Sequence, residues 1–303
     1  NSDLLFFQKL RELTGQTVNE YANVNGVNPN DLSLDMFSAS ELNDFGIVSY
    51  YGYDYLGNKL DNSVTFEDFF TGVDDDGARS FLVPSNQPNY LAFFVQDKFT
   101  FKDIIFRVGL RVDRFDANRK VLKDPFSLYE IMGARDFYAS IGEEQPAGVE
   151  DDFKVYLQSA GSNTVKAFRS GEDWFFANGN PANDGSVIFG GEVINPKFVD
   201  EDANIQSPDF DPNNSFEDYE PQISVMPRIA FSFSLTDEAT FFANYSVLTQ
   251  RPQNGIQAFA DNYYYWQEAG SSGVQNNPNL RPEKTIDYEI GFQQKISNSS
   301  AIK

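Results

Sequence analysis

The chain has 303 residues and is strongly acidic, with 45 Asp and Glu against 23 Lys and Arg and a formal net charge of -22. Such a surface repels nucleic acid and anionic lipid headgroups, which argues against a DNA- or RNA-binding role. The chain has no Cys and no His, so disulfides, thiolate or imidazole metal sites and a Ser-His-Asp triad are excluded. Its 30 Phe and 15 Tyr are more than a disordered acidic chain carries. We therefore expect a folded protein that is not an enzyme.

The first 88 residues show little regular alternation of apolar and polar side chains. Two short segments within them, residues 4–13 and 31–45, have the composition of helices. Asp31 and either Ser38 or Ser40 are candidate N-caps, because short polar side chains can accept hydrogen bonds from the first free backbone N–H groups. We expect an irregular region with short helices ahead of the first strand.

Three aspartates and a glycine follow one another at residues 74–77. Carboxylates at Asp74 and Asp76 resemble part of a calcium loop, since clustered acidic oxygens and a turn glycine suit that cation. The run lacks the alternate spacing and the distal glutamate of an EF-hand. A solvated acidic turn is the favoured interpretation, and we expect no other cofactor.

Residues 89–116 show the first sustained two-residue alternation, which is typical of strands with two different faces. A tight turn at Lys102 and Asp103 divides the segment into two strands, so we expect an antiparallel hairpin. Arg107 and Arg111 fall on the more polar face of its second strand.

Residues 117–222 form a long connection rich in Asn, Asp, Gly and Pro. Connections of this length are unusual in compact domains and are functional or disordered. Trp174 lies in an aromatic cluster within it. Residues 223–249 then repeat the hairpin design, with a turn at residues 236–238.

A second long connection covers residues 250–283, and a last alternating strand with the start of a turn covers residues 284–303. Asp287 and Glu289 alternate with apolar residues in that strand. The connection contains a second aromatic cluster, made of Tyr263, Tyr264, Tyr265 and Trp266. Exposed Tyr and Trp often mark ligand contacts. The alternative is that both clusters pack the loops or lie in an aromatic girdle at a membrane surface.

Five alternating strands with tight turns at one end and long connections at the other are typical of an outer-membrane β-barrel. The strands have the length that a bilayer requires, and a wet lumen explains charges at Arg107, Arg111, Asp287 and Glu289. A soluble all-β protein with one face packed and one solvated gives the same alternation, and it stays open as an alternative. No apolar run is long enough for a transmembrane helix, and no signal peptide opens the chain. We interpret the chain as an internal piece of a longer protein.

Three segments resemble TonB-dependent outer-membrane receptors. They are LAFFVQDKFTFKDIIFRVGLRVDRFD, PRIAFSFSLTDEATFFANYSVLTQRP and NPNLRPEKTIDYEIGFQQKIS, which occur in the family's order and cover about a quarter of the chain. SYYGYDYLGNKL, followed by FEDFF, is similar to an extracellular stretch of the Bacteroidetes receptors that begin with a carboxypeptidase-regulatory-like domain. The resemblance is carried by the barrel motifs, and the long loops show little family signature.

The resemblance implies an all-β protein: a transmembrane antiparallel β-barrel of about 22 strands, of which about five are present here. Hairpins at 89–116 and 223–249 and the strand at 284–303 belong to the wall, and residues 1–88, 117–222 and 250–283 are expected to be extracellular. A plug that is not in this chain would couple the barrel to TonB for import of a small-molecule, glycan or peptide ligand. The protein would then lie in the outer membrane of a Gram-negative bacterium.

Two other classes of function stay open. One is a soluble or cell-surface β-sandwich that acts as an interaction or adhesin module. The other is a barrel that serves as a scaffold and docks a surface lipoprotein through its loops. Detergent dependence separates a lipid-facing barrel from a sandwich, and a co-purifying partner would indicate the scaffold.

Overall fold

The computed structural model describes residues 4–17, 19–43, 50–74, 77–253, 255, 258–266 and 276–302. The chain divides into two units, which we describe separately. The first comprises Asn1–Val121 and Asp218–Lys303, and the second comprises Leu122–Glu217. Among the described helices, none has the length and apolar character needed to cross a membrane.

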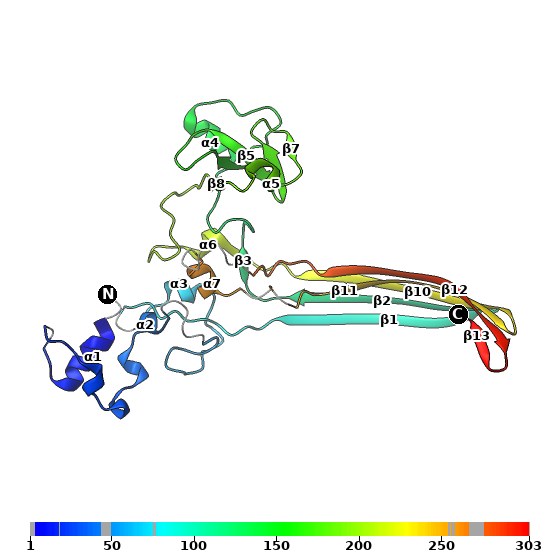
Figure 1. Cartoon of the computed structure of the whole chain (residues 1–303), viewed down its shortest axis with the longest axis horizontal. Coiled ribbons are helices and arrows are strands. Elements are labelled where there is room, and N and C mark those ends of the chain that lie inside the picture. The colour runs from blue at the N-terminus through cyan, green and yellow to red at the C-terminus, as the bar shows by residue number, and fades with distance from the viewer. Residues whose placement is uncertain are drawn as a thin grey trace. The chain divides into compact units, whose positions relative to one another are not determined.

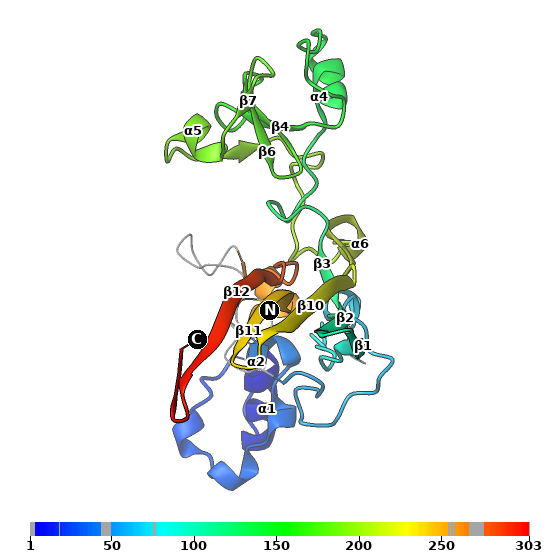
Figure 2. The ribbon, with the colours of Figure 1, turned by 90° about the vertical axis from the view of Figure 1, so that its right-hand side faces the viewer.

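The first unit contains a six-stranded antiparallel sheet with the order β1-β2-β10-β11-β12-β13 (Figure 1). Its strands are β1 (Asn89–Phe101), β2 (Ile104–Asp116), β10 (Gln222–Thr236), β11 (Ala239–Gln250), β12 (Glu283–Ser297) and the short β13 (Ser300–Ile302). The five long strands lie within one or two residues of the ranges expected from the alternation. Figure 2, which looks toward the strand ends, shows β1, β2, β10, β11 and β12 side by side in a curved row. Six strands do not close on themselves, and β1 and β13 form the edges of the described sheet.

Cross-strand register gives the sheet one apolar and one mostly polar face. Phe93 pairs with Val112 and Val225 with the same residue from the other side, so like side chains share a face across three strands. The exposed apolar side chains of this face include Leu91, Phe93, Val95, Val108, Leu110, Ile223, Val225, Ile229, Tyr245, Ile286, Tyr288, Ile290 and Phe292. Asp97, opposite Val108, is an exception on this face that nothing in the structure explains.

Tight turns join the strands at one end of the sheet. Residues 102–103 connect β1 to β2, residues 237–238 connect β10 to β11, and residues 298–299 connect β12 to β13. Lys102 takes the left-handed conformation with φ of 54°, which a two-residue hairpin turn requires. The connections from β2 to β10 and from β11 to β12 leave from the opposite end and are long.

Phenylalanines form a row on the apolar face near the tight turns. Phe99 stacks on Phe106 with ring centroids 5.2 Å apart, and Phe231 lies 6.2 Å from Phe106 and 6.0 Å from Phe241. At the far side of the row, Phe241 pairs with Phe292 in register. Rings that gather at one level of an apolar face resemble the aromatic girdles of membrane barrels.

Of the two helices expected ahead of β1, one forms nearly as predicted and the other is much shorter. The first, α1 (Leu4–Thr14), has nearly the expected bounds, whereas the helix expected over 31–45 is wrong. Asp31 ends a 3-10 turn, and α2 begins at Ala39 because Ser38 and Glu41 form a capping box: Glu41 N–H donates to Ser38 Oγ, and Ser38 N–H donates to Glu41 Oε2. The remaining helical segments of this unit are η1 (Val24–Gly26), η2 (Pro29–Asp31), η3 (Leu34–Met36), α2 (Ala39–Asn43), α3 (Asp68–Thr71) and α7 (Ala260–Tyr264).

The second unit, Leu122–Glu217, is a folded module with its own sheet where we expected a long loop. Its five strands have the order β7-β6-β5-β4-β8, with bounds β4 (Lys154–Leu157), β5 (Val165–Ser170), β6 (Asp173–Phe176), β7 (Pro181–Ala182) and β8 (Asn195–Pro196). Its helices are α4 (Ala134–Ile141), α5 (Gly185–Phe189) and α6 (Pro212–Ser215). Two short strands, β3 (Lys120–Leu122) and β9 (Phe216–Asp218), pair with each other where the chain enters and leaves the module.

Both faces of this small sheet are buried. Val155 and Phe168, which are register partners, pack with α4 on one face, while Tyr156 and Ala167, the next pair, pack with Phe189 on the other. Because neither face is solvated, these short strands show no regular alternation of apolar and polar residues. This explains why the sequence pattern did not reveal the module.

Candidate functional site

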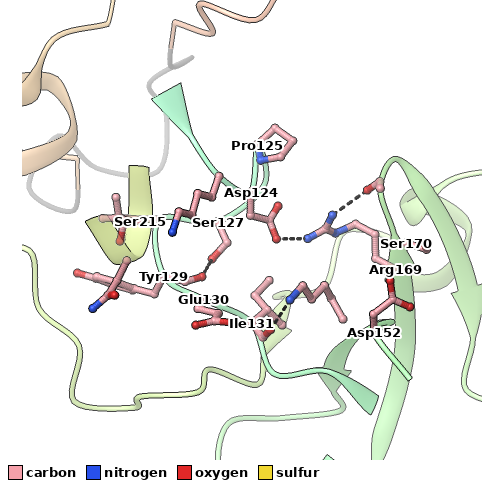
Figure 3. Close-up of a pocket in the computed structure, with 15 residues that line it drawn as sticks. Asp124, Pro125, Ser127, Tyr129, Glu130, Ile131, Asp152, Arg169, Ser170 and Ser215 are labelled. Atoms are coloured by element: carbon pink, nitrogen blue, oxygen red, sulfur yellow. Dashed lines mark hydrogen bonds and ion pairs between the residues drawn. The ribbon is translucent and has the colours of Figure 1, made fainter. Parts of the chain in front are cut away.

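The second unit contains a cavity of about 400 Å³ whose wall combines charged and apolar groups (Figure 3). It lies between the segment of residues 123–131, the strands β4 and β5, and the start of the chain's return through α6. The ionic side chains that line it are Lys123, Asp124, Glu130, Asp152, Lys154 and Arg169. None of these residues was singled out from the sequence.

Arg169 organises the wall of the cavity, and only 2% of this residue is exposed. Its guanidinium forms an ion pair with Asp124, donates from Nε to Tyr156 Oη at 2.8 Å, and donates from one terminal nitrogen to the Gly171 carbonyl at 2.7 Å. Figure 3 shows Asp124 and Arg169 pointing toward each other. Burial raises the pKa of Tyr156, and the hydrogen bond from Arg169 opposes that rise. The arginine thus ties the 124–127 segment to β4 and β5.

Aromatic rings surround the same guanidinium. Its central carbon lies 4.7 Å from the ring centroid of Phe126, 5.8 Å from Tyr156 and 6.0 Å from Trp174. Trp174 also packs at 4.9 Å against Tyr156 and covers Gly185 so closely that a Cβ there would lie 3.1 Å from the indole. Trp174 is half-buried and does not line the cavity. A ligand contact through Trp174 stays a prediction, and the geometry gives it a packing role.

The other charged side chains of the cavity differ in whether they have a hydrogen-bond partner. Lys154 Nζ donates to the Ile131 carbonyl at 3.0 Å. For Lys123, Glu130 and Asp152, no side-chain partner occurs within the part of the chain that the structure describes. A cavity with free groups of both charges suits a ligand that can both donate and accept hydrogen bonds.

The second aromatic cluster lies in the first unit and is also packed. Tyr263 is 4% exposed, and burial raises its pKa to about 12. Tyr264 makes edge contacts with Phe69 and Phe81 at 5.6 and 5.4 Å. Tyr265 lies 5.0 Å from Tyr264, and Trp266 lies 6.3 Å from Tyr263. These contacts build a loop core, and ligand binding by this cluster stays a prediction.

Arg107, Arg111, Asp287 and Glu289 share the mostly polar face of the large sheet. Arg111 Nε lies 2.8 Å from Asp113 Oδ1, and Glu289 accepts a hydrogen bond from Asn244 at 3.0 Å across the β11–β12 pair. Arg111 is therefore engaged by a neighbour on its own strand, and Glu289 by a residue of the adjacent strand. That this face lines a lumen stays a prediction at the level of these residues.

The carboxylate of Asp74 stabilises a turn by accepting a backbone hydrogen bond. Its Oδ1 accepts from the Ala78 N–H at 2.8 Å, while Val73 and Arg79 form an isolated antiparallel bridge around the turn. Asp76 lies outside the described residues. Among the residues that are described, no group of three or more acidic side chains is placed to hold a metal ion.

A strongly apolar face on a long-stranded antiparallel sheet cannot stay in water, because monomeric soluble proteins rarely expose contiguous apolar patches above a few hundred Å². With a polar opposite face, this sheet is the wall of a transmembrane β-barrel. The family model described as TonB dependent receptor-like, beta-barrel matches residues 2–301, and the chain belongs to that family. No curated protein and no solved structure matches the chain.

Membership of this family decides between the barrel and the soluble β-sandwich, which the alternation of apolar and polar residues did not distinguish. Proteins of this family are transporters of the Gram-negative outer membrane that act with TonB, and they are not enzymes. The interpretation as a β-sandwich module is therefore wrong. The sequence motifs in the hairpins supported this assignment, whereas no motif in the sequence indicated the cavity around Arg169.

Proposed function

We propose that the protein imports a ligand by a process energised through TonB, and that the 122–217 module captures this ligand on the outside of the cell. The asymmetry of the large sheet carries the proposal. Its tight turns lie at one end, which is the periplasmic end in outer-membrane barrels, and its long connections leave from the other. The connection from β2 to β10 contains a folded module with a polar cavity.

The cavity chemistry favours a hydrogen-bonding ligand, such as a glycan or a peptide, over an apolar small molecule. The cavity presents hydrogen-bond donors and acceptors on Lys123, Glu130 and Asp152. An apolar ligand would displace water from these groups without offering a hydrogen bond in return, and this loss is unfavourable. The rigid support of Arg169 keeps the rim in place, which limits the ordering that binding requires.

On this proposal, the polar face with Arg107, Arg111, Asp287 and Glu289 lines the lumen and contacts a plug. TonB acts on that plug and opens a path for the ligand. The resemblance of residues 49–70 to receptors of Bacteroidetes with a carboxypeptidase-regulatory-like domain supports an origin in that group.

A surface lipoprotein partner has separate support. Val193, Ile194 and Val199 are 78%, 48% and 52% exposed on the module, although their side chains are apolar. Exposed apolar side chains that lie close together in one segment are typical of protein contacts. We propose this segment as the docking surface, and co-purification of a lipoprotein that Val193→Asp abolishes would test it.

Uptake by intact cells tests the main proposal. Cells that express the protein are given labelled oligosaccharides and labelled short peptides, with and without a working TonB. We expect uptake of one ligand class to require TonB while binding at the cell surface persists without it. Lys123→Gln combined with Asp152→Asn should weaken surface binding, and Arg135→Gln, an exposed position outside the cavity, should not. Uptake that is unchanged without TonB would contradict the proposal.

A further inference from the structure

A second cavity, of about 220 Å³, lies in the first unit beside the ends of β2 and β10 that are remote from the tight turns. Two arginines, Arg119 and Arg251, and the tyrosine Tyr219 line it. In a chain with a net charge of -22, two cationic side chains at one small cavity are unexpected. Neither the family nor the cavity around Arg169 accounts for them.

Two aromatic rings hold the guanidinium of Arg251. Its guanidinium carbon lies 4.0 Å from the ring centroid of Phe115 and 5.2 Å from that of Tyr90. Within the described parts of the chain, Arg251 has neither an acidic partner nor a hydrogen-bond acceptor. Stacking on rings fixes the plane of the guanidinium and leaves its N–H donors available at the edge.

Arg119 is anchored at one end and open at the other. Its terminal nitrogens donate to Asn86 Oδ1 at 2.6 Å and to the Ala258 carbonyl at 3.4 Å, and its carbon lies 5.2 Å from the Phe259 ring. Its Nε is buried and has no hydrogen-bond partner among the described residues. A buried donor without an acceptor is destabilising unless a ligand or water supplies one.

Tyr219 adds a third donor. The residue is 5% exposed, its ring meets Phe115 edge-on at 6.0 Å, and its hydroxyl is buried without a hydrogen-bond partner in the described structure. Burial raises the pKa of Tyr219 and the negative charge of Asp116 raises it further, while the positive charges of Arg251 and Arg119 oppose the rise. The hydroxyl therefore lies within the electrostatic influence of both guanidinium groups.

The acids around the cavity are engaged by other bases. Asp113 pairs with Arg111 at 2.8 Å and Asp116 with Arg114 at 3.0 Å. Lys120 pairs with both Glu67 and Asp218, at 3.2 and 3.0 Å. The positive charge of Arg119 and Arg251 is therefore not neutralised by these neighbours.

The opposite wall of the cavity is apolar. Its lining includes Phe115, Pro88, Pro252, Pro278 and Leu280. An inorganic anion would gain nothing from this wall, whereas an organic acid could place its carboxylate at the donors and its hydrocarbon part against the prolines and the ring.

We propose that this cavity binds the carboxylate end of an organic acid, with the carboxylate between Arg119, Arg251 and Tyr219 and the apolar body against Phe115 and Pro278. If the transported ligand binds here, it carries a carboxylate. The biological role of the site therefore rests on the proposed transport function. Binding itself does not depend on TonB or on the 122–217 module, so it can be tested separately.

Benzoate is a suitable probe because it combines a carboxylate with an apolar ring. Saturation-transfer NMR on the intact protein in a neutral detergent should show saturable binding of benzoate, with an affinity on the order of millimolar for so small a ligand. Benzamide, which has the same shape without the charge, should not bind, and inorganic phosphate should bind more weakly. Equal binding of benzamide would overturn the proposal. Equal binding of phosphate would also overturn it, because the apolar wall would then contribute nothing.

Two variants locate the site. Tyr219→Phe removes only a hydroxyl that has no partner in the described structure, so the fold should be unaffected while benzoate binding weakens about threefold to tenfold. Arg251→Gln removes a charge-assisted donor and should weaken binding about tenfold or more. Arg135→Gln removes the same charge in the other unit and serves as the matched control. Benzoate binding that is unchanged in both Tyr219→Phe and Arg251→Gln would overturn the proposal.

The experiments distinguish failure of the carboxylate site from failure of the proposed transport function. If uptake of glycans or peptides fails to depend on TonB but benzoate binding is lost in the two variants, the carboxylate site stands and the transport proposal falls. If uptake depends on TonB but benzoate does not bind, the carboxylate site falls alone.

Discussion

The ring of Phe242 covers the backbone of Gly291, its cross-strand partner on the mostly polar face of the sheet. A Cβ atom added to Gly291 would lie only 2.7 Å from Cζ of Phe242. Aromatic side chains that cover a glycine on the neighbouring strand fix the register of a pair. The contact therefore holds β12, the strand with Asp287 and Glu289, in register with β11.

Gly291→Ala should destabilise the sheet, because the new methyl group collides with the ring of Phe242. We expect a loss of about 1–3 kcal/mol in the free energy of unfolding. Gly109→Ala is the matched control on the same face of β2, where the added Cβ would lie 3.5 Å from Gln96, an ordinary contact. Urea unfolding of the protein in detergent, followed by gel mobility, measures both. Equal effects at the two glycines would contradict the packing argument.

Ile290→Lys tests which face meets lipid. Ile290 is 73% exposed in the middle of β12, and a lysine on the lipid face of a barrel costs about 2–4 kcal/mol at the bilayer midplane. Ser246→Lys puts the same charge on the opposite face, across from Asp287, where we expect little loss. The yield of folded protein in lipid vesicles measures the difference. A lysine that is tolerated at 290 and not at 246 would reverse the assignment of the two faces.

Arg169→Met should loosen the rim of the cavity in the 122–217 module. The change leaves Asp124 without its cation in a poorly hydrated place, and breaking a buried pair in this way costs about 3–5 kcal/mol. Limited proteolysis should then cleave near residues 124–127. Replacing Asp124 by Asn in the same chain should restore part of the resistance, since the unpaired charge is removed. In Arg135→Met, where the broken pair with Asp151 is exposed, the loss should be below about 1 kcal/mol.

Asp261 should make stability depend on pH. Burial raises the pKa of this carboxyl above its usual value, so its neutral form is favoured in the folded state. Its contribution to stability is therefore greatest below pH 3.8 and is lost as the pH rises through the folded-state pKa. Asp261→Asn should be more stable than the parent protein at pH 7 and should lose that advantage at low pH. Thermal unfolding of both proteins across this range measures it, and a constant difference would contradict the sign.

The long strands could be predicted because lipid and water impose a two-residue period on them. The alternation around Phe93 and Val95 and around Tyr288 and Ile290 follows from one face that meets hydrocarbon. Asp97 breaks that rule, and no neighbour in the structure explains it. No local signal joins β2 to β10, which pair across more than a hundred residues, and the sequence analysis did not predict this pairing.

The module at 122–217 could not be predicted, because its strands are short and buried on both faces. The run Val155-Tyr156-Leu157 contains no polar residue, and its side chains enter two different cores. Arg169 lay in an unremarkable segment, and its importance follows from its pairing with Asp124 and Tyr156, which are distant from it in the sequence. Trp174 and Tyr263 stood out as aromatic clusters, but composition does not distinguish a ring that packs from a ring that binds.

The pairing of β3 with β9 places the start and the end of the module next to each other. Because its two ends are adjacent, the module is inserted at a single position in the connection from β2 to β10. We expect that another insert at this position would not change the register between β2 and β10, which runs from the pair of Gln222 and Phe115 to the pair of Phe233 and Ile104. If the module captures the ligand as proposed, replacing this one insert would change the captured ligand and leave the wall of the barrel unchanged.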